Sequence, residues 1–210
     1  MSTTVQKGKF ITIEGIEGVG KSSNVNLIAD LIQKAGNQVV VTREPGGTPI
    51  AEAIRKVLLA EYDEEIFGQT ELLLLYAARI QHVEHVIKPA LAEGKWVVCD
   101  RFVDATYAYQ GAGRGIPIEK IDSLHQWALG DFVPDCTIIL DASPEIAFER
   151  IKKNRDLDRF EKEKIFFFQR IRQQYLQIAG RDKQRYRIVD ASRPLKDVQD
   201  IIRGIIVNIF

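Results

Sequence analysis

Short apolar runs alternate along the chain with longer segments in which apolar residues recur every three or four positions. The short runs are typical of buried strands, and the longer segments are typical of helices with one apolar face. Strands that alternate with helices in this way form a parallel sheet covered by helices. We therefore predict an α/β fold with helices on both faces of a parallel five-stranded sheet. The predicted strands are Phe10–Glu14, Gln38–Thr42, Trp96–Asp100, Thr137–Asp141 and Arg187–Val189.

The helices are predicted between and after these strands. In the last of them Phe168, Ile171 and Tyr175 fall on one face, and we interpret this face and the adjoining aromatic cluster at 166–168 as core packing. Gly36 follows the first helix, where glycine commonly adopts the left-handed conformation that ends a helix. The predicted helices are Ser22–Ala35, Pro49–Leu59, Glu71–Glu93, Ile118–Leu129, Pro144–Lys152 and Glu161–Ala179.

One segment breaks this periodicity, because nearly every residue of Lys152–Arg159 is charged. This composition suits a short exposed loop, and we predict a lid at about residues 152–160. No internal repeat and no Ser/Pro-rich linker is visible elsewhere, so residues 1–210 are predicted to form a single domain.

Composition and charge narrow the class of protein. Lys plus Arg (29) equals Asp plus Glu (29), whereas a general nucleic-acid binder carries a basic surplus, so we predict no nucleic-acid partner. The longest apolar run, Leu72–Ala78, is far shorter than the about 20 residues that cross a bilayer, so no membrane partner is predicted. Met1–Gly8 lacks the apolar core of a signal peptide, and Cys99 and Cys136 lie in strand-like contexts. We therefore expect a cytoplasmic protein with reduced, buried thiols.

The decisive motif is Gly15–Ser22, which fits G-x-x-x-x-G-K-[ST] between a predicted strand and a predicted helix. Glycines let successive backbone N–H groups surround a phosphate, and the helix N-terminus adds positive charge there. Lys21 supplies a cation for the β- and γ-phosphates, and the Ser22 hydroxyl is placed to ligate Mg²⁺. A chance glycine-rich turn is the alternative, but the flanking elements argue against it. The residues predicted to bind ATP are Gly15, Ile16, Glu17, Gly18, Val19, Gly20, Lys21, Ser22 and Ser23.

A phosphate-binding loop alone does not identify a reaction, because motors, switches, transporters and small-molecule kinases all use one. The guanine-reading motif Asn-Lys-x-Asp does not occur in the chain, which argues against a GTP switch. The chain is also short for a motor or a transporter ATPase. Phosphoryl transfer to a small acceptor is therefore the favoured reaction.

Six further segments are specific when they are taken together: Thr42–Thr48, Tyr76–Arg79, Asp100–Phe102, Ala108–Gly111, Gly113–Gly115 and Phe132–Asp135. With them the chain resembles thymidylate kinases of the bacterial type along nearly its whole length. The resemblance implies the P-loop NTPase fold, with ATP and dTMP as substrates and Mg²⁺ as cofactor. It also implies a homodimer packed through helices, with which the apolar run Leu72–Leu75 is compatible.

Three charged residues are predicted to act on the phosphates beside Lys21. Asp100 ends an apolar strand, where a carboxylate can hold Mg²⁺ opposite Ser22, unless it is a generic strand-end carboxylate. The resemblance implies that Arg101 clamps the acceptor phosphate near the γ-phosphate, where charge stabilisation dominates catalysis. It gives Arg55 a second contact with the acceptor phosphate, against the alternative of an exposed helix arginine. No general base is needed, because the acceptor phosphate is already an anionic nucleophile.

The resemblance also implies how the nucleoside is held. Glu17 contacts the 3′-hydroxyl, unless it faces solvent, and Tyr109 lies under the deoxyribose, where its bulk would crowd a ribose 2′-hydroxyl. Arg79 reads the O4 edge of thymine, with an ion pair to a nearby acid as its competing role. Thr106 and Gln110 line the base.

Three positions depart from the patterns of such kinases. Leu75 stands where a phenylalanine commonly stacks on thymine, and Asn154 stands where a lid arginine often aligns. Val19 occupies the loop position that carries arginine in the eukaryotic type, so we expect the catalytic charge to come from the lid. The candidates, in order, are Arg155, Arg159 and Lys153, with a solvated charge run as the alternative for any one of them.

We therefore predict the reaction ATP + dTMP → ADP + dTDP. The first alternative is a kinase for another nucleoside monophosphate, which would share the loop and lid but not the base pocket. The second is a nucleotide-dependent switch or assembly protein with no acceptor.

Overall fold

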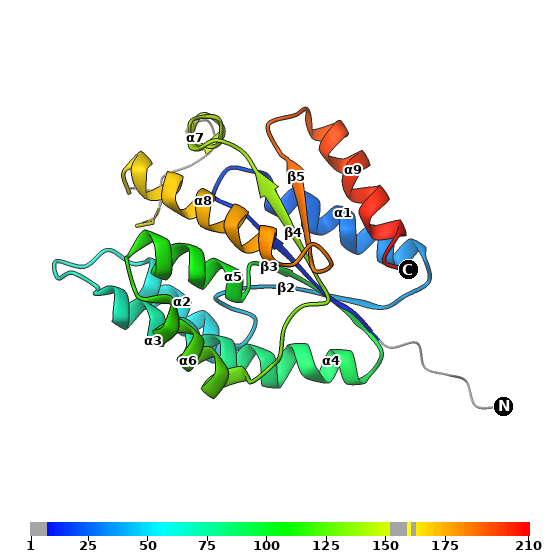
Figure 1. The fold of residues 1–210 in the computed structure, drawn as a ribbon. Helices are drawn as coiled ribbons and strands as arrows, with labels where there is room; N and C mark the ends of the chain where they lie inside the picture. The colour runs from blue at the N-terminus through cyan, green and yellow to red at the C-terminus, as the bar shows by residue number, and fades with distance from the viewer. Residues whose placement is uncertain (1–7, 152–158, 161–162) are drawn as a thin grey trace.

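The computed structural model describes residues 8–151, 159–160 and 163–210. In these residues five strands form one parallel sheet in the order β2-β3-β1-β4-β5 (Figure 1). The strands are β1 (Phe10–Glu14), β2 (Val39–Arg43), β3 (Trp96–Asp100), β4 (Cys136–Asp141) and β5 (Tyr186–Asp190). The predicted sheet is thus confirmed. Strand ends differ from the prediction by a single residue at most.

Helices cover both faces of this sheet, as predicted. On one face α1 (Lys21–Lys34) packs against α9 (Leu195–Val207), and on the other α8 (Ile165–Arg181) packs against the π-helical segment Tyr107–Gly113 (Figure 1). The other α-helices of the described residues are α2 (Pro49–Leu59), α3 (Gly68–His82), α4 (Lys88–Ala92), α5 (Val103–Thr106), α6 (Ile118–Leu129) and α7 (Pro144–Ile151).

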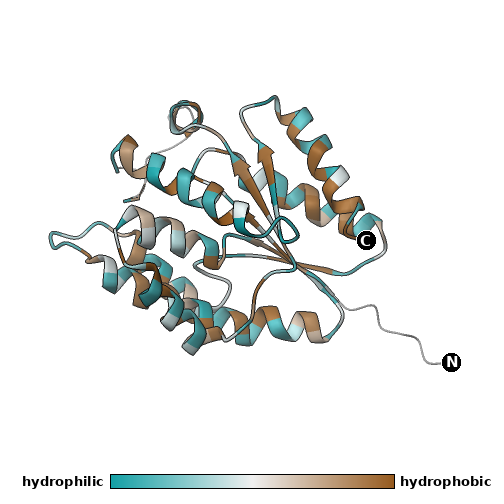
Figure 2. Cartoon of the chain, in the orientation of Figure 1, coloured by the Kyte–Doolittle hydropathy of each residue, from teal (hydrophilic) through white to brown (hydrophobic). Residues whose placement is uncertain are grey.

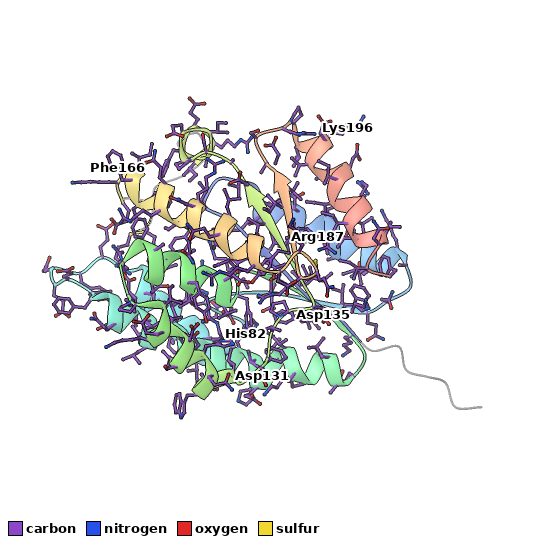
Figure 3. The ribbon with its side chains drawn as sticks, viewed as in Figure 1. His82, Asp131, Asp135, Phe166, Arg187 and Lys196 are labelled. Atoms are coloured by element: carbon purple, nitrogen blue, oxygen red, sulfur yellow. The ribbon has the colours of Figure 1, made fainter. Side chains whose placement is uncertain are left out.

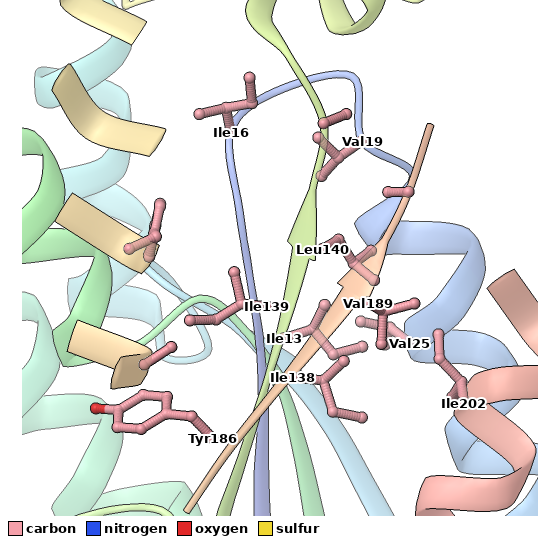
Figure 4. Packing of buried hydrophobic residues seen from close by; sticks show 14 of the residues in the cluster. Ile13, Ile16, Val19, Val25, Ile138, Ile139, Leu140, Tyr186, Val189 and Ile202 are labelled. Carbon is pink, nitrogen blue, oxygen red and sulfur yellow. The ribbon is translucent and has the colours of Figure 1, made fainter. Parts of the chain in front are cut away.

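The core lies on both sides of β1, whose five residues are all buried. Apolar residues make up most of the strands, and the helices turn their apolar side toward the sheet (Figure 2). On the α1 and α9 face, Ile13, Val25 and Ile202 converge between the layers (Figure 4). This packing fixes the carboxyl ends of β1 and β3, from which the phosphate loop and the Asp100–Phe102 segment emerge.

The sequence predicts that the two cysteines and the aromatic cluster at 166–168 are buried. Cys99 and Cys136 are free, buried thiols, as predicted. Phe167 and Phe168 belong to the core, whereas Phe166 is 68% exposed and points away from the protein (Figure 3). The core interpretation of this aromatic cluster therefore holds for two rings and is wrong for the third, because the third lies on the outer side of the helix.

Several helices differ from the prediction. The predicted helix Glu71–Glu93 is interrupted by the π-helical turn Val83–Ile87, just before Pro89, which lacks the N–H that would continue the α-helical pattern. The helix predicted from Glu161 begins instead at Ile165. Three helical segments were not predicted at all: α5, the segment Tyr107–Gly113 and α9. Among the described residues, no helix combines the length and apolar character that crossing a membrane requires.

Candidate active site

The phosphate loop joins β1 to α1, and its backbone requires glycine. Gly15, Gly18 and Gly20 have φ angles of 133°, 77° and 90°. A Cβ at Gly15 would lie 2.4 Å from the carbonyl oxygen of Leu140, and one at Gly18 would lie 2.2 Å from that of Ala147. Gly20 offers no side chain to cap α1, which leaves the N–H groups of the first helical turn for an anion. The loop is therefore shaped for phosphate.

Lys21 lies over this loop. Its Nζ donates hydrogen bonds to the carbonyl oxygens of Gly15, at 3.0 Å, and Ile16, at 2.8 Å. Burial and the neighbouring Arg101 lower the pKa of Lys21 to about 8, although Asp100 acts in the opposite direction. A bound triphosphate would supply the negative charge that favours the protonated lysine.

Ser22 and Asp100 lie at the same edge of the sheet. Asp100 ends β3, and the parallel register pairs it with Ile13 near the end of β1. Both residues line one cleft. Their hydroxyl and carboxylate oxygens are ligands that Mg²⁺ accepts, together with phosphate oxygens and waters. Among the described residues no group of three or more His, Cys, Asp or Glu is arranged to hold a metal.

Arg101 is held at the centre of the site. Its φ of 70° is unusual for a non-glycine residue and costs of the order of 1–3 kcal/mol. One guanidinium nitrogen donates to the carbonyl oxygen of Gly15, at 2.9 Å, and to the hydroxyl of Tyr175, at 3.1 Å. The other donates to Glu17, at 2.8 Å, and to the hydroxyl of Tyr109, at 3.0 Å. These four contacts fix the direction of the guanidinium.

The carboxylate of Glu17 is ionised within this cluster. Burial opposes its ionisation, but Arg101 and Lys21 outweigh burial and lower the pKa of Glu17. Burial raises the pKa of Tyr109 well above its usual value, so its hydroxyl keeps the proton and donates to Glu17, at 2.8 and 2.7 Å. Glu17 therefore does not simply face solvent, which was the alternative interpretation.

Arg79 reaches the site from α3 and is fully enclosed. Its Nε donates to Glu44 at 2.6 Å, and its two terminal nitrogens donate to the hydroxyl of Thr106, at 3.0 Å, and to the carbonyl oxygen of Phe102, at 3.2 Å. The second oxygen of Glu44 lies 3.1 Å from Nδ1 of the buried His82. The ion pair considered as an alternative role is thus present. Arg79 nevertheless also lines the cleft, so the two roles coexist.

The cleft that these residues share has a volume of about 460 Å³. All eight residues predicted to bind the acceptor line it: Glu17, Arg55, Leu75, Arg79, Arg101, Thr106, Tyr109 and Gln110. From the phosphate loop and the start of α1, the lining includes Gly18, Gly20, Lys21, Ser22 and Ser23. Ile16 and Val19 instead pack into the core, and Figure 4 shows both on the loop beyond the ends of the strands. Gly15 does not line the cleft, but its carbonyl oxygen accepts hydrogen bonds from Lys21 and Arg101.

Other lining residues had no predicted role. Arg43, Glu44 and Pro45 belong to the Thr42–Thr48 segment, so the sequence indicated their region but not their contacts. The remaining ones are Leu58, Leu59, Phe102, Ala105, Arg150, Ile151 and Phe160. Apart from Phe102, which belongs to the Asp100–Phe102 segment, these residues lie outside any motif, and only the fold brings them to the cleft.

Arg159, one of the predicted lid arginines, does not line the cleft. Its Nε donates to the carbonyl oxygen of Leu58, at 3.1 Å, and a terminal nitrogen donates to Glu71, at 2.8 Å. Its guanidinium also lies over the ring of Phe160. The other lid candidates, Lys153 and Arg155, lie outside the described residues, as does Asn154. The catalytic roles of Arg155 and Arg159 remain predictions.

Comparison with known proteins agrees with this geometry. The family model described as thymidylate kinase matches residues 13–202. A thymidylate kinase of Pseudomonas putida strain W619 is 50% identical over 200 residues, which cover 95% of this chain and 97% of that protein. One from Pseudomonas savastanoi pv. phaseolicola is 53% identical over 192 residues, 91% of each chain. The crystal structure of thymidylate kinase from Ehrlichia chaffeensis superimposes with a TM-score of 0.75 at 32% identity, covering 96% of this chain and 98% of that one. This chain therefore belongs to the thymidylate kinase family.

Proposed function

We propose that this protein transfers the γ-phosphate of ATP to the phosphate of dTMP, giving ADP and dTDP. The observation that carries the proposal is the shared cleft, which is lined both by residues of the phosphate loop and by all the predicted acceptor residues. Arg101 stands between the two sets and contacts both the loop, at Gly15, and the acceptor wall, at Tyr109. Donor and acceptor phosphates would meet at this arginine.

The donor would bind at the start of α1. Backbone N–H groups of the loop and Lys21 would hold the β- and γ-phosphates. Ser22 and Asp100 would hold Mg²⁺, which neutralises charge on the phosphate oxygens. Release of Lys21 Nζ from the carbonyl oxygens of Gly15 and Ile16 would allow it to reach the triphosphate.

The acceptor would lie along the opposite wall. Arg101 and Arg55 would bind its phosphate, and their positive charge would bring two anions together, which is the main electrostatic problem of the reaction. Glu17 would accept a hydrogen bond from the 3′-hydroxyl, against the ring of Tyr109. On this proposal the base lies among four residues of the wall: Leu75, Arg79, Thr106 and Gln110.

We also propose that the lid supplies catalytic charge through Arg155 or Arg159.

We further propose that the chain is a single domain, acts in the cytoplasm and forms a homodimer. Exposed apolar side chains on two helices that pack together support the homodimer: Leu73 of α3 is 60% exposed and Val57 of α2 is 43% exposed. Sedimentation of the purified protein would test the oligomeric state.

A coupled assay of ADP production tests the proposed activity. Purified protein with ATP and Mg²⁺ is assayed with dTMP, dUMP, dCMP and dGMP at matched concentrations. We expect the highest kcat/KM with dTMP. A clear preference for another monophosphate would favour the first alternative, and slow ATP hydrolysis indifferent to every acceptor would favour a switch.

A further inference from the structure

Gln110 carries a buried acceptor that the described residues leave without a partner. The side chain is 1% exposed and lines the cleft. Its Nε2 donates to Glu71 at 3.1 Å, whereas its Oε1 has no hydrogen bond among the described residues. Buried polar atoms are usually paired, so an orphaned acceptor in the wall of a ligand cleft indicates that a ligand supplies the donor.

Glu71 determines which end of this amide faces the cleft. It is fully buried in the first turn of α3 and does not line the cleft itself. Its two oxygens receive hydrogen bonds from Arg114, at 3.2 and 3.1 Å, and from Arg159, at 2.8 Å. A carboxylate held by two guanidinium groups only accepts hydrogen bonds. The amide of Gln110 must therefore turn its NH₂ to Glu71, because the reversed amide would bring two acceptors together.

We propose that Glu71 is a positioning residue for base specificity: it fixes the Gln110 amide so that the carbonyl oxygen accepts a hydrogen bond from a ring N–H of the base. This inference rests on the proposed function of the cleft. Arg79 carries N–H donors and also lines the cleft. It lies near Gln110, because it donates a hydrogen bond to Thr106, which is about one helical turn before Gln110. The cleft wall thus offers a hydrogen-bond acceptor, the carbonyl oxygen of Gln110, beside the hydrogen-bond donors of Arg79.

Thymine and uracil match this arrangement, and cytosine reverses it. Thymine presents the N3–H donor next to the O4 acceptor. Neutral cytosine presents the N3 acceptor next to the N4 amino donor. If Glu71 were a glutamine, its own amide could donate to Oε1 of Gln110, and the Gln110 amide could then turn its NH₂ toward the base. The distinction between thymine and cytosine would be weakened.

A double-mutant cycle tests this role. The ratio of kcat/KM for dTMP to that for dCMP is measured in the wild type, Glu71→Gln, Gln110→Ala and the double variant. We expect Glu71→Gln to lower the ratio about tenfold, the effect of one hydrogen bond of ordinary strength, mainly through a higher KM for dTMP. In the Gln110→Ala background the same substitution should leave the ratio unchanged.

Two further variants separate positioning from a purely structural role. Glu163→Gln removes the other carboxylate partner of Arg114, at 2.5 Å, without touching Gln110, and should leave the ratio unchanged. If Glu71→Gln fails to fold, as judged by thermal unfolding, Gln110→Leu in the otherwise wild-type chain should still lower the ratio about tenfold.

The proposal is overturned if folded Glu71→Gln keeps the wild-type ratio, if Glu71→Gln lowers the ratio equally with and without Gln110, or if Gln110→Leu keeps it. Failure of the proposed function has a different signature, since the wild type itself would then show no preference for dTMP over the other monophosphates.

Discussion

Arg101 and Glu17 form an ion pair, with 2.8 Å between a guanidinium nitrogen and a carboxylate oxygen, at the boundary between the phosphate loop and the acceptor wall. Both side chains are mostly buried, at 15% and 17% exposed. The two residues are predicted to contact different parts of dTMP, the phosphate and the 3′-hydroxyl. Their pairing means that each orients the other before any substrate binds. A site arranged in advance loses little free energy in reorganisation when charge develops.

Replacing Arg101 with lysine should therefore be damaging although the charge is kept. Lysine cannot reproduce the four contacts of the guanidinium, which span Gly15, Tyr175, Glu17 and Tyr109. We expect kcat and kcat/KM for dTMP to fall together, by about tenfold or more, in steady-state assays. Arg203→Lys, an exposed arginine on α9, is the control. A change confined to the KM for ATP would place Arg101 on the donor side instead.

Lys21→Ala should lower kcat at least about a hundredfold while the fold survives, because the substitution removes a charge that stabilises the transferring phosphoryl group. Lys34→Ala, at the exposed end of the same helix, should leave kcat unchanged. Circular dichroism and thermal unfolding check the fold. Near-normal turnover in a folded Lys21→Ala protein would contradict the assignment of the loop.

The pKa of Lys21 predicts how ATP affinity changes with pH. In the free enzyme this pKa is about 8, so raising the pH through 8 removes the positive charge that ATP requires. Calorimetric titration should show ATP binding about tenfold weaker at pH 9 than at pH 7, since about nine-tenths of a group with pKa 8 is deprotonated at pH 9.

Glu14 titrates in the same range and provides the competing explanation. Burial and the neighbouring Asp104 raise the pKa of Glu14 to about 8, and its ionisation would also weaken anion binding. The two explanations differ in Lys21→Ala, where the loss of affinity between pH 7 and 9 should disappear. A loss that persists in this variant would assign the effect to Glu14.

The lid prediction concerns Arg155 and Arg159. Replacing both with alanine should reduce phosphoryl transfer by far more than it weakens ATP binding, because closure would act on the transition state and exclude water. Single-turnover kinetics and calorimetry measure the two effects. Because Arg159 contacts Glu71 and Leu58, the single variants are also needed. Equal losses of transfer and binding in the double variant would indicate a simple binding role.

The parts of the site that the sequence predicts are those that depend on local chemistry. The phosphate loop is contiguous, and its glycines, Lys21 and Ser22 follow one another between a strand and a helix. The carboxylates that orient the acceptor residues could not be predicted in this way, because they come from distant parts of the sequence. Glu44 holds Arg79 and Glu71 holds Gln110 across 35 and 39 residues of sequence, and no local pattern indicates either pairing.

In the fold, too, the elements with a local sequence pattern are predictable and those without one are not. The strands were predictable because each is a short apolar run. Helix α9 carries a usable signal, since Val198, Ile202 and Ile206 recur at four-residue spacing and are all buried. The short α5 and the segment Tyr107–Gly113 carry none. Helix α5 has only four residues, and Tyr107–Gly113, which packs against α8, is π-helical and follows no α-helical repeat in the sequence.

The last prediction concerns Leu75, which lines the cleft from α3 and is partly buried. A phenylalanine at this position would offer the thymine ring a flat aromatic face, and such stacking adds about 0.5–1.5 kcal/mol beyond simple burial. Leu75→Phe should therefore tighten dTMP binding by a factor of about 2–10. Titration calorimetry of the wild type and the variant with dTMP measures the difference.

Leu195→Phe, an exposed leucine on α9, is the control for the added ring and should not change dTMP affinity. Another ring is already present in the cleft, because Phe160 lines it and packs edge-to-face on Tyr109, with 6.1 Å between ring centroids. If Leu75→Phe binds dTMP no better while its stability is intact, then Leu75 does not face the base or the Phe160 ring already covers it. Titrating Phe160→Leu separates these two cases, since dTMP binding weakens only if Phe160 stacks on the base.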